Sequence, residues 1–425
     1  MKLKPPTLRK HKLRSLVALG VLAAGVSGLA LTSATPAFAD PTENLVAVGS
    51  DTIQDVYNSF AFKLGGNALA SYNAVNPVTG DASGSTTGTP PAQLLTPVDG
   101  SAATSGSPAG VNCSFSRPNG SGPGIAALEA AEGQADPGVT APAPTAGCVD
   151  IARSSSAPGA DNSGVNEGDY TGANPNQYVP FALDAVTGAI GPATGGTVGG
   201  VATVATVLPA TVEQFTVTEL QSLYNCQPTP VGSTTFWPYD GNPADLPSGD
   251  QRIDLYIPQL GSGTEKFWVQ TTLGLSASAP PACDNHTIVN GTLTGTAVEE
   301  HDGTAVATDP YGYGPFSIAQ WVSQSNGHND RRHGAVLQDI NGEVPLVGGV
   351  MNTGQNGAGT AFPITRFVFS VVAKSRLDSA TDPIHSLLLG TTSFVCRDKA
   401  DITGYGFALI NSACGEELSA YTTEP

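Results

Sequence analysis

The chain has 425 residues, with 18 lysines and arginines against 36 aspartates and glutamates, and a formal net charge of −18. This acidic balance excludes nucleic acid and anionic membrane surfaces as expected partners, because both are recognised through basic patches. The length exceeds what one small hydrophobic core organises, so two lobes or domains are expected.

Residues 1–39 have the pattern of a secretory signal peptide, which predicts secretion to the outside of the cell. The apolar segment Leu16–Leu31 precedes Ala37-Phe38-Ala39, a small-residue site that predicts cleavage before Asp40. The segment is short for a membrane span, so no membrane insertion is expected. Removing six basic residues and no acidic one leaves 12 basic against 36 acidic residues, a net charge of −24. The basic residues are Lys2, Lys4, Arg9, Lys10, Lys12 and Arg14.

An even number of cysteines in an exported chain predicts disulfides. Six cysteines allow fifteen pairings. Pairing of sequence neighbours is our hypothesis: Cys113–Cys148, Cys226–Cys283 and Cys396–Cys414. No C-x-x-C motif occurs and the histidines are scattered, so no metal or other cofactor is expected.

The first predicted unit is a strand over Leu45–Val48, the turn Gly49-Ser50-Asp51-Thr52 and a helix over Ile53–Leu64. Such a turn offers backbone N–H groups and the positive end of a helix dipole to an anion. The alternative is that Ser50 or Asp51 only caps the helix.

Two further turns of this kind follow. Asn119-Gly120-Ser121-Gly122 opens a helix that includes Ile125. A strand over Cys148–Ala152 ends in Arg153-Ser154-Ser155-Ser156, a dense set of donors. Arg153 could form a bidentate pair with an oxyanion, and the alternative is a surface ion pair.

The middle of the chain predicts a strand over Tyr178–Val186 and a helix that starts with the capping box Thr216-Val217-Thr218-Glu219. A strand over Arg252–Ile257 leads to the turn Gly261-Ser262-Gly263-Thr264 and a helix over Thr264–Leu273. This fourth turn either binds an anion or caps its helix.

The last part predicts a short helix over Pro315–Val322, a central strand over Ile364–Val372 and a helix over Pro383–Leu389. His328 and His333 belong to a charged segment that is expected to be solvated, so surface histidines are favoured over the alternative of metal ligands. Strands and helices alternate along the chain, which predicts mostly parallel sheets with helices on both faces. In such sheets ligands bind at the carboxyl ends of strands, where the four turns lie.

The order of these turns resembles the phosphate-binding proteins of ABC transporters, which are type II periplasmic binding proteins. The resemblance covers the chain from Leu45 to about Lys374, and the leader and composition are similar to those of actinobacterial secreted proteins. The segments that carry it are Val48–Ile53, Asn119–Ile125, Ala152–Pro158, Pro180-Phe181 and Gly261–Thr264.

The resemblance implies an α/β, two-lobed architecture with mixed, mostly parallel sheets and a cleft between the lobes. It places lobe I at residues 44–180 plus 317–425 and lobe II at 181–316, with crossings near Val179–Phe181 and Tyr313–Phe316. It also implies contacts to the anion from Thr52, the Ile53 amide, Ser121, Ser154 or Ser155, Ser262, Gly263 and Thr264. The residues themselves add Ser50, Asp51, Gly122 and Arg153 to the predicted ligand-binding set.

Two positions depart from the family pattern. The family has an arginine shortly before its Gly-Ser-Gly-Thr turn, where this chain has Ile257-Pro258-Gln259, and Arg153 is the candidate substitute. The family also has an aspartate that accepts the phosphate proton, where this chain has Ser155 and Ser156. Asp51 is the candidate substitute for that carboxylate.

The resemblance implies a secreted, monomeric solute-binding protein that captures a small oxyanion, most favourably phosphate, for an ABC permease, and that is not an enzyme. Sulfate and an organic phosphate remain alternative ligands. One alternative function is a secreted serine hydrolase or phosphatase that uses Ser262 with His286 or His301. Another is an extracellular adhesion module without a small ligand.

Overall fold

The computed structural model describes residues 45–64, 68–74, 115–133, 147–160, 175–238, 246–276, 283, 298–357 and 359–418, and four strands of two residues outside these ranges. The chain divides into two units, Met1–Ala39 and Asp40–Pro425. The predicted signal peptide lies outside the described residues and stays a prediction. No helix in the described part of the chain is long and apolar enough to cross a membrane.

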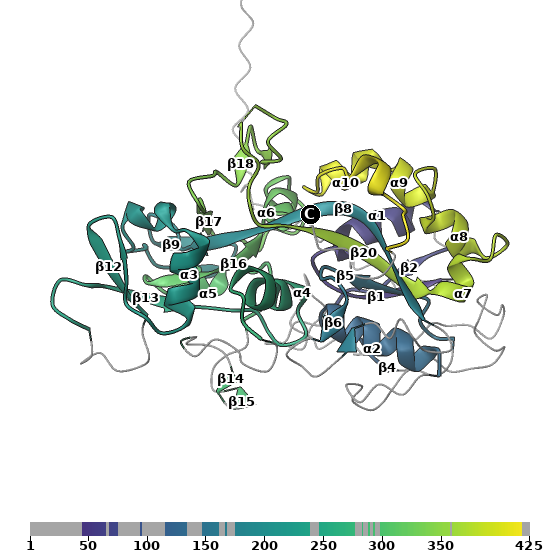
Figure 1. Cartoon of the computed structure of the whole chain (residues 1–425), viewed down its shortest axis with the longest axis horizontal. Coiled ribbons are helices and arrows are strands. Elements are labelled where there is room, and N and C mark those ends of the chain that lie inside the picture. The colour runs from purple at the N-terminus through teal and green to yellow at the C-terminus, as the bar shows by residue number, and fades with distance from the viewer. Residues whose placement is uncertain are drawn as a thin grey trace, which may run out of the picture. The chain divides into compact units, whose positions relative to one another are not determined.

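Helices occur along the whole described chain (Figure 1). The α-helices are α1 (Gln54–Lys63), α2 (Ser121–Ala131), α3 (Val217–Tyr224), α4 (Gly263–Lys266), α5 (Thr304–Thr308), α6 (Ile318–Ser325), α7 (Lys374–Leu377), α8 (Pro383–Leu388), α9 (Phe394–Arg397) and α10 (Lys399–Gly404). A π-helix covers Phe267–Thr272, and 3₁₀-helices cover Ala210–Gln214 and Asn411–Ala413.

Ten strands form one mixed sheet, and the others form short hairpins. The sheet strands are β1 (Val46–Gly49), β2 (Ala70–Ser71), β5 (Ile151–Ser154), β8 (Asn176–Ile190), β11 (Thr229–Val231), β12 (Thr234–Pro238), β13 (Gln251–Leu255), β16 (Gly312–Ser317), β17 (Val336–Leu337) and β20 (Thr365–Ala373). The hairpin strands are β3 (Leu94–Leu95), β4 (Phe115–Ser116), β6 (Gly159–Ala160), β7 (Asn166–Glu167), β9 (Gly196–Val198), β10 (Val201–Thr203), β14 (Ile288–Val289), β15 (Thr292–Leu293), β18 (Leu346–Val347) and β19 (Val350–Met351).

The strand order is β11-β12-β13-β16-β8-β20-β5-β1-β2, with β17 also paired to β8. We call β5, β1 and β2 the β1 block, and β11, β12, β13 and β16 the β13 block. Within the blocks the strand pairs are parallel except for the antiparallel pair β11–β12, whereas β8 and β20 are antiparallel to each other and to their neighbours. Figure 1 shows the long strands β8 and β20 side by side between the two blocks. The predicted mixed α/β sheet with helices is therefore confirmed.

Alternating strand residues serve two cores, which is why helices cover both faces of the sheet. Ala47 packs in the larger core with Phe60 of α1, whereas Val48 packs in a second core with Ile125 of α2. The larger core also contains Ile253 of β13, so it continues from the β1 block to the β13 block. Both blocks are thus stabilised by one continuous set of apolar contacts.

Local sequence signals explain several element boundaries. The Thr216 side chain accepts from the backbone N–H of Glu219 and the Glu219 side chain bonds back, which confirms the predicted capping box of α3. The helix predicted from Pro315 is wrong at its start, because Pro315 and Ser317 lie in β16. Ser317 instead caps α6, with its hydroxyl accepting from Gln320 N at 3.1 Å.

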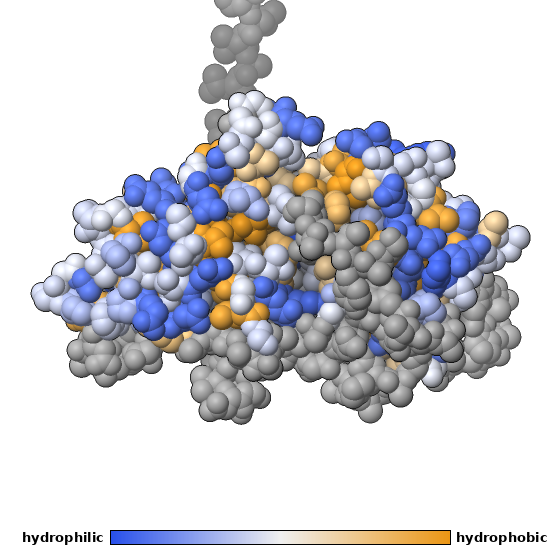
Figure 2. All heavy atoms as spheres, in the orientation of Figure 1, coloured by the Kyte–Doolittle hydropathy of each residue, from blue (hydrophilic) through white to orange (hydrophobic). Residues whose placement is uncertain are grey.

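Two predicted disulfides are confirmed, Cys226–Cys283 and Cys396–Cys414. Cys148 is disulfide-bonded, and the predicted pairing partner Cys113 lies outside the described residues. On the face shown in Figure 2, hydrophilic residues cover much of the surface and hydrophobic residues form smaller groups. Scattered apolar residues of this kind are ordinary for a solvated protein surface.

Candidate functional site

The first and third turns meet because their strands are parallel neighbours. Gly49 of β1 pairs with Arg153 of β5, so both strands end at the same edge of the sheet. There Ser50 Oγ donates to Ser155 Oγ at 3.0 Å, and Thr52 Oγ1 donates to the same oxygen at 3.1 Å. All three hydroxyl side chains are buried.

The second turn reaches the same point from the start of α2. Ser121 Oγ lies 3.3 Å from Ser155 Oγ and accepts from Ser155 N at 3.0 Å. The α2 N-cap is Gly120, whose φ of 102° lies in the region that favours glycine, and it makes no side-chain cap. The hydroxyl group of Ser121 contacts Ser155 of the third turn instead of capping α2. We call Ser50, Thr52, Ser121 and Ser155 the hydroxyl cluster.

The fourth turn approaches the hydroxyl cluster from the β13 block. Gly122 N donates to Gly261 O at 3.1 Å, which joins the second and fourth turns. A Cβ built on Gly263 would overlap the hydroxyl oxygens of Ser121 and Ser155. Glycine at position 263 thus permits a close approach that no other residue would allow, and the four turns meet in one buried place.

The capping alternative holds for one turn and not for another. Ser262 Oγ accepts from the backbone N–H groups of Thr264 and Glu265, each at 3.1 Å, so Ser262 caps α4. The N-cap of α1 is Ile53, which makes no side-chain cap, so neither Ser50 nor Asp51 serves that role. The first turn consequently keeps its polar side chains for contacts outside its own helix.

Arg153 is buried, and its guanidinium bonds to backbone beside the first turn. Nε donates to Ser50 O at 3.2 Å, and Nη2 donates to Gly49 O at 3.1 Å and Tyr72 O at 2.6 Å. Nη1 donates to Ser71 Oγ at 2.6 Å. These contacts hold β1, β2 and β5 together and leave Arg153 outside the hydroxyl cluster.

Two other residues of the predicted set also bond elsewhere. Ser154 Oγ donates to Ser156 O at 2.8 Å and accepts from Ser156 N at 3.2 Å, so it stabilises its own turn. The backbone N–H of Gly122 is used by Gly261 O, as described above.

Arg366 of β20 is the guanidinium that reaches the fourth turn, and the sequence analysis missed it. Its Nε and Nη2 donate to Asp184 Oδ2 at 3.1 and 2.8 Å, and Nη2 also donates to Thr264 Oγ1 at 2.9 Å. Its Nη1 is buried and has no hydrogen-bond partner among the described residues. An arginine within the apolar run Ile364–Val372 was the signal for a special role.

A second cluster contains Asp51, Glu300 and His301, and we call it the carboxylate–imidazole cluster. Sequence patterns predicted other roles for Asp51 and His301, and Glu300 was not among the predicted residues. His301 Nε2 lies 2.8 Å from Thr52 Oγ1, 3.7 Å from Asp51 Oδ1 and 3.8 Å from Glu300 Oε1. Glu300 Oε2 accepts from Thr264 N at 3.2 Å and bonds to the Ser262 hydroxyl. Three consecutive titratable residues, Glu299-Glu300-His301, were the signal in the sequence.

Burial sets the charge of this second cluster. Burial lowers the pKa of His301 to about 3, so the imidazole is neutral near pH 7. Burial and then the charge of Glu300 raise the pKa of Asp51 well above its usual range. Within the described part of the chain, no N–H or hydroxyl donor reaches either Asp51 oxygen or Glu300 Oε1.

The geometry gives no support to a serine hydrolase. Ser262 bonds to Glu300 and to its own helix, whereas His301 Nε2 contacts Thr52. A catalytic triad needs an acid on the other ring nitrogen, and His301 Nδ1 has no partner among the described residues. His286, the other predicted base, lies outside the described residues.

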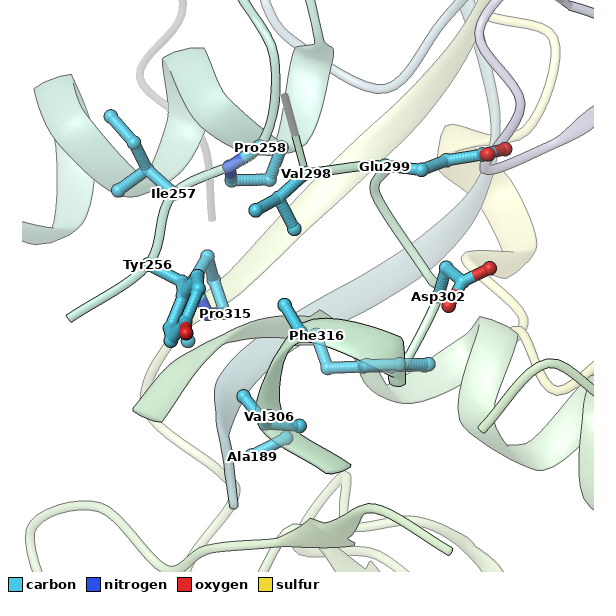
Figure 3. A pocket seen from close by; sticks show the side chains of 12 residues that line it. Ala189, Tyr256, Ile257, Pro258, Val298, Glu299, Asp302, Val306, Pro315 and Phe316 are labelled. Carbon is cyan, nitrogen blue, oxygen red and sulfur yellow. The ribbon is translucent and has the colours of Figure 1, made fainter. Parts of the chain in front are cut away.

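A small pocket lies apart from the hydroxyl cluster (Figure 3). Its volume is about 20 Å³, close to the size of one water molecule. Tyr256, Pro258, Val298 and Phe316 supply apolar walls, and Figure 3 shows the carboxylates of Glu299 and Asp302 extending away from Val298. The Tyr256 hydroxyl donates to Asp309 Oδ2 at 2.8 Å, and two carboxylates line the pocket, so it suits an anion poorly and the candidate site is the meeting point of the turns.

No protein-family model matches the chain, and no curated protein matches its sequence. Among solved structures, an ABC-type phosphate transport receptor from Vibrio cholerae aligns over 86% of this chain and 99% of its own, with 16% identity and a TM-score of 0.43. A putative phosphate ABC transporter substrate-binding protein from Clostridium perfringens, with bound phosphate, covers 86% and 99% at 12% identity and a TM-score of 0.41. A phosphate-binding protein from Stenotrophomonas maltophilia covers 87% and 91% at 14% identity and a TM-score of 0.39. At such TM-scores the likeness carries no argument, so function is inferred from the residues of the site.

Proposed function

We propose that the chain is a secreted solute-binding protein that captures a small oxyanion, most favourably phosphate, where the four turns meet. Residues 44–180 plus 317–425 would form lobe I and residues 181–316 lobe II, and the anion would enter as the lobes separate. The proposal includes a monomer that delivers its ligand to an ABC permease. It includes no catalytic residue.

The observation that carries the proposal is the convergence of hydroxyl groups from separate strand ends. Ser155 Oγ is contacted by the hydroxyl groups of Ser50, Thr52 and Ser121. Gly263 of the fourth turn packs against the hydroxyl groups of Ser121 and Ser155. Hydroxyl groups donate to an oxyanion as readily as to one another, so an anion can replace these mutual hydrogen bonds. Capping the helices α1, α2 and α4 does not require four buried hydroxyl groups in mutual contact.

Arg366 supplies the positive charge that the sequence analysis assigned to Arg153. Its buried Nη1 is without a hydrogen-bond partner among the described residues, and its Nη2 contacts Thr264 of the fourth turn. A guanidinium is always protonated and forms strong, directed bonds to oxyanions. Arg366 also ties β20 to Asp184 of β8, so an anion bound here would be held by the two strands between the blocks.

The acidic group Asp51 favours phosphate over sulfate in this proposal. Phosphate carries a proton near pH 7, whereas sulfate carries none. Asp51 is hydrogen-bonded to Glu300, which keeps the lower pKa of the two, so this pair offers a carboxylate to which only the protonated anion can donate. Asp51 is buried beside Thr52 of the hydroxyl cluster. Sulfate is therefore the discriminating competitor.

The test is calorimetric titration of the mature protein, dialysed free of phosphate, with phosphate and then with sulfate. We expect heat from phosphate and weaker or no heat from sulfate. Ser155→Ala removes the hydroxyl that three others contact and should weaken phosphate binding at least about tenfold, the worth of one or two hydrogen bonds.

Ser386→Ala is the matched control, because Ser386 is exposed on α8 and its hydroxyl donates to Pro383 O at 3.2 Å, within its own helix. This variant should bind phosphate as the unaltered protein does. A folded protein that gives no heat with either anion would contradict the proposal and favour an adhesion module without a small ligand.

A further inference from the structure

Asp51, Glu300 and His301 have a geometry that neither the fold nor oxyanion capture requires. One ligand atom from each lies within 4.8 Å of the others, and the three residues are buried. Two ligands of one tetrahedral zinc ion are about 3.3 Å apart, given zinc–ligand bonds of about 2 Å. The measured separations from His301 Nε2, 3.7 and 3.8 Å, need only a small contraction to reach that value.

The carboxyl groups of Asp51 and Glu300 are hydrogen-bonded to each other, and no N–H or hydroxyl group of the described residues donates to them at the atoms that face the cluster. These atoms are both carboxyl oxygens of Asp51 and Oε1 of Glu300. Burying carboxyl groups is costly, and holding two of them together on one shared proton adds repulsion. A cation between them would remove both costs at once.

The surroundings hold the ligand atoms in place. Glu300 Oε2 bonds to Ser262 and to Thr264 N, which leaves Oε1 for the cluster. His301 has a φ of 65°, a left-handed conformation that non-glycine residues rarely adopt, and Gln324 Nε2 donates to its carbonyl oxygen at 2.9 Å. This backbone is therefore fixed by its neighbours in the position that brings the imidazole to the carboxylates.

We propose that Asp51, Glu300 and His301 bind one divalent transition-metal ion, with Zn²⁺ as the best match. Two carboxylate oxygens and one imidazole nitrogen suit Zn²⁺, which takes three protein ligands and one exchangeable ligand in open sites. Ca²⁺ requires six to eight oxygen ligands, so this set fits it poorly. Cysteine and histidine spacing predicted no metal, because two of the three ligands are carboxylates.

The fourth coordination position would face the hydroxyl cluster. Thr52 Oγ1, which contacts Ser155 Oγ, lies 2.8 Å from His301 Nε2 and so beside the ion. An oxygen of an anion bound among the hydroxyl groups could take that position. This last step rests on the proposed oxyanion capture, whereas the metal site itself does not.

The surroundings of His301 Nδ1 indicate how tightly the site should bind zinc. Metal-bound histidines usually donate through their other nitrogen, and loss of such a partner weakens binding by about 10- to 100-fold. His301 Nδ1 has no partner among the described residues. We therefore expect affinity weaker than that of closed structural zinc sites.

The test is calorimetric titration of the chelator-treated full chain with Zn²⁺ in buffer without phosphate, repeated with Co²⁺ while the visible absorption of the bound ion is recorded. We expect one ion per chain and a Co²⁺ spectrum of a four-coordinate site. Asp51→Asn, Glu300→Gln and His301→Gln should each weaken binding at least about tenfold. Circular dichroism melting without metal identifies any variant that fails to fold, and the remaining variants then decide.

His333→Gln is the matched control, since His333 contacts Val198 O and lies 3.7 Å from Asp302, outside the cluster. It should bind Zn²⁺ as the unaltered chain does. Absence of zinc binding, or binding that all three cluster variants retain, would overturn the proposal and leave a shared proton between Asp51 and Glu300. Because phosphate is absent from this titration, such a failure says nothing against phosphate capture, and failed phosphate capture says nothing against the metal site.

Discussion

Arg153 and Arg366 are both buried on paired strands, yet their surroundings differ. Arg153 of β5 donates to carbonyl oxygens and one hydroxyl group, all of them neutral, and burial lowers its pKa to about 10. Arg366 of β20 pairs with the Asp184 carboxylate, contacts Thr264 and keeps one buried nitrogen without a partner among the described residues. The first joins strands of one block, and the second joins β20 to β8 and to the fourth turn.

The difference teaches that position next to a serine-rich turn does not make an arginine an anion ligand. Backbone carbonyl groups of neighbouring strands can use its donors first, as happens for Arg153. An arginine remains available when its partners leave one nitrogen unused, as for Arg366. The two residues therefore should respond differently to substitution.

The largest effect is expected for Arg366→Leu. Asp184 would remain buried without its partner, so the free energy of unfolding should fall by about 3–5 kcal/mol. In Arg366→Lys the charge stays, yet the paired bonds to Asp184 are lost, and phosphate affinity should fall by roughly 10- to 100-fold. Chemical denaturation and calorimetry measure the two quantities. Unchanged phosphate binding in a folded Arg366→Lys protein would remove Arg366 from the site.

Arg153→Leu should affect stability without affecting the affinity of the folded protein. It removes the guanidinium hydrogen bonds to Gly49 O, Ser50 O and Tyr72 O, which should lower the free energy of unfolding by roughly 3 kcal/mol. Phosphate titration below the unfolding transition should give the affinity of the unaltered protein. Loss of binding at unchanged stability would reverse the comparison and restore the role that the sequence analysis gave to Arg153.

Gly263→Ala tests the closure of the fourth turn over the hydroxyl cluster. Its added Cβ would overlap the hydroxyl groups of Ser121 and Ser155, and overpacking of this kind costs about 1–3 kcal/mol. We expect weaker phosphate binding, because the fourth turn can no longer approach the others. Gly249→Ala is a control with open space around it, although its φ of 102° adds strain of its own. Equal phosphate affinity in the two variants would argue against the closure.

The smallest effect is expected for the N-caps. Ser262→Ala and Thr216→Ala each remove a side-chain cap, from α4 and α3, and each should lower the free energy of unfolding by about 1 kcal/mol. Only Ser262→Ala should also weaken phosphate binding, since Ser262 belongs to the fourth turn. Equal phosphate affinities in the two variants would show that Ser262 caps α4 and does not bind phosphate.

The sequence by itself determined the local units of this protein. Short apolar runs predicted β1, β8 and β20, alternating apolar residues predicted β13, and the capping box predicted α3, because these signals act between residues near in the chain. Pairing of consecutive cysteines predicted Cys226–Cys283 and Cys396–Cys414, although the paired residues lie 57 and 18 positions apart. Glycine-containing turns at strand ends pointed to the edge where the hydroxyl cluster lies.

Only the tertiary structure decided which side chains complete the site. Arg366 meets Thr264, and His301 meets Thr52, through a strand order that places residues more than a hundred positions apart side by side. The donors of Arg153 were used by Tyr72 O, a contact that depends on β2 lying next to β1. Local patterns carry no information about such pairings, because they arise from the packing of strands and from which buried polar groups find partners first.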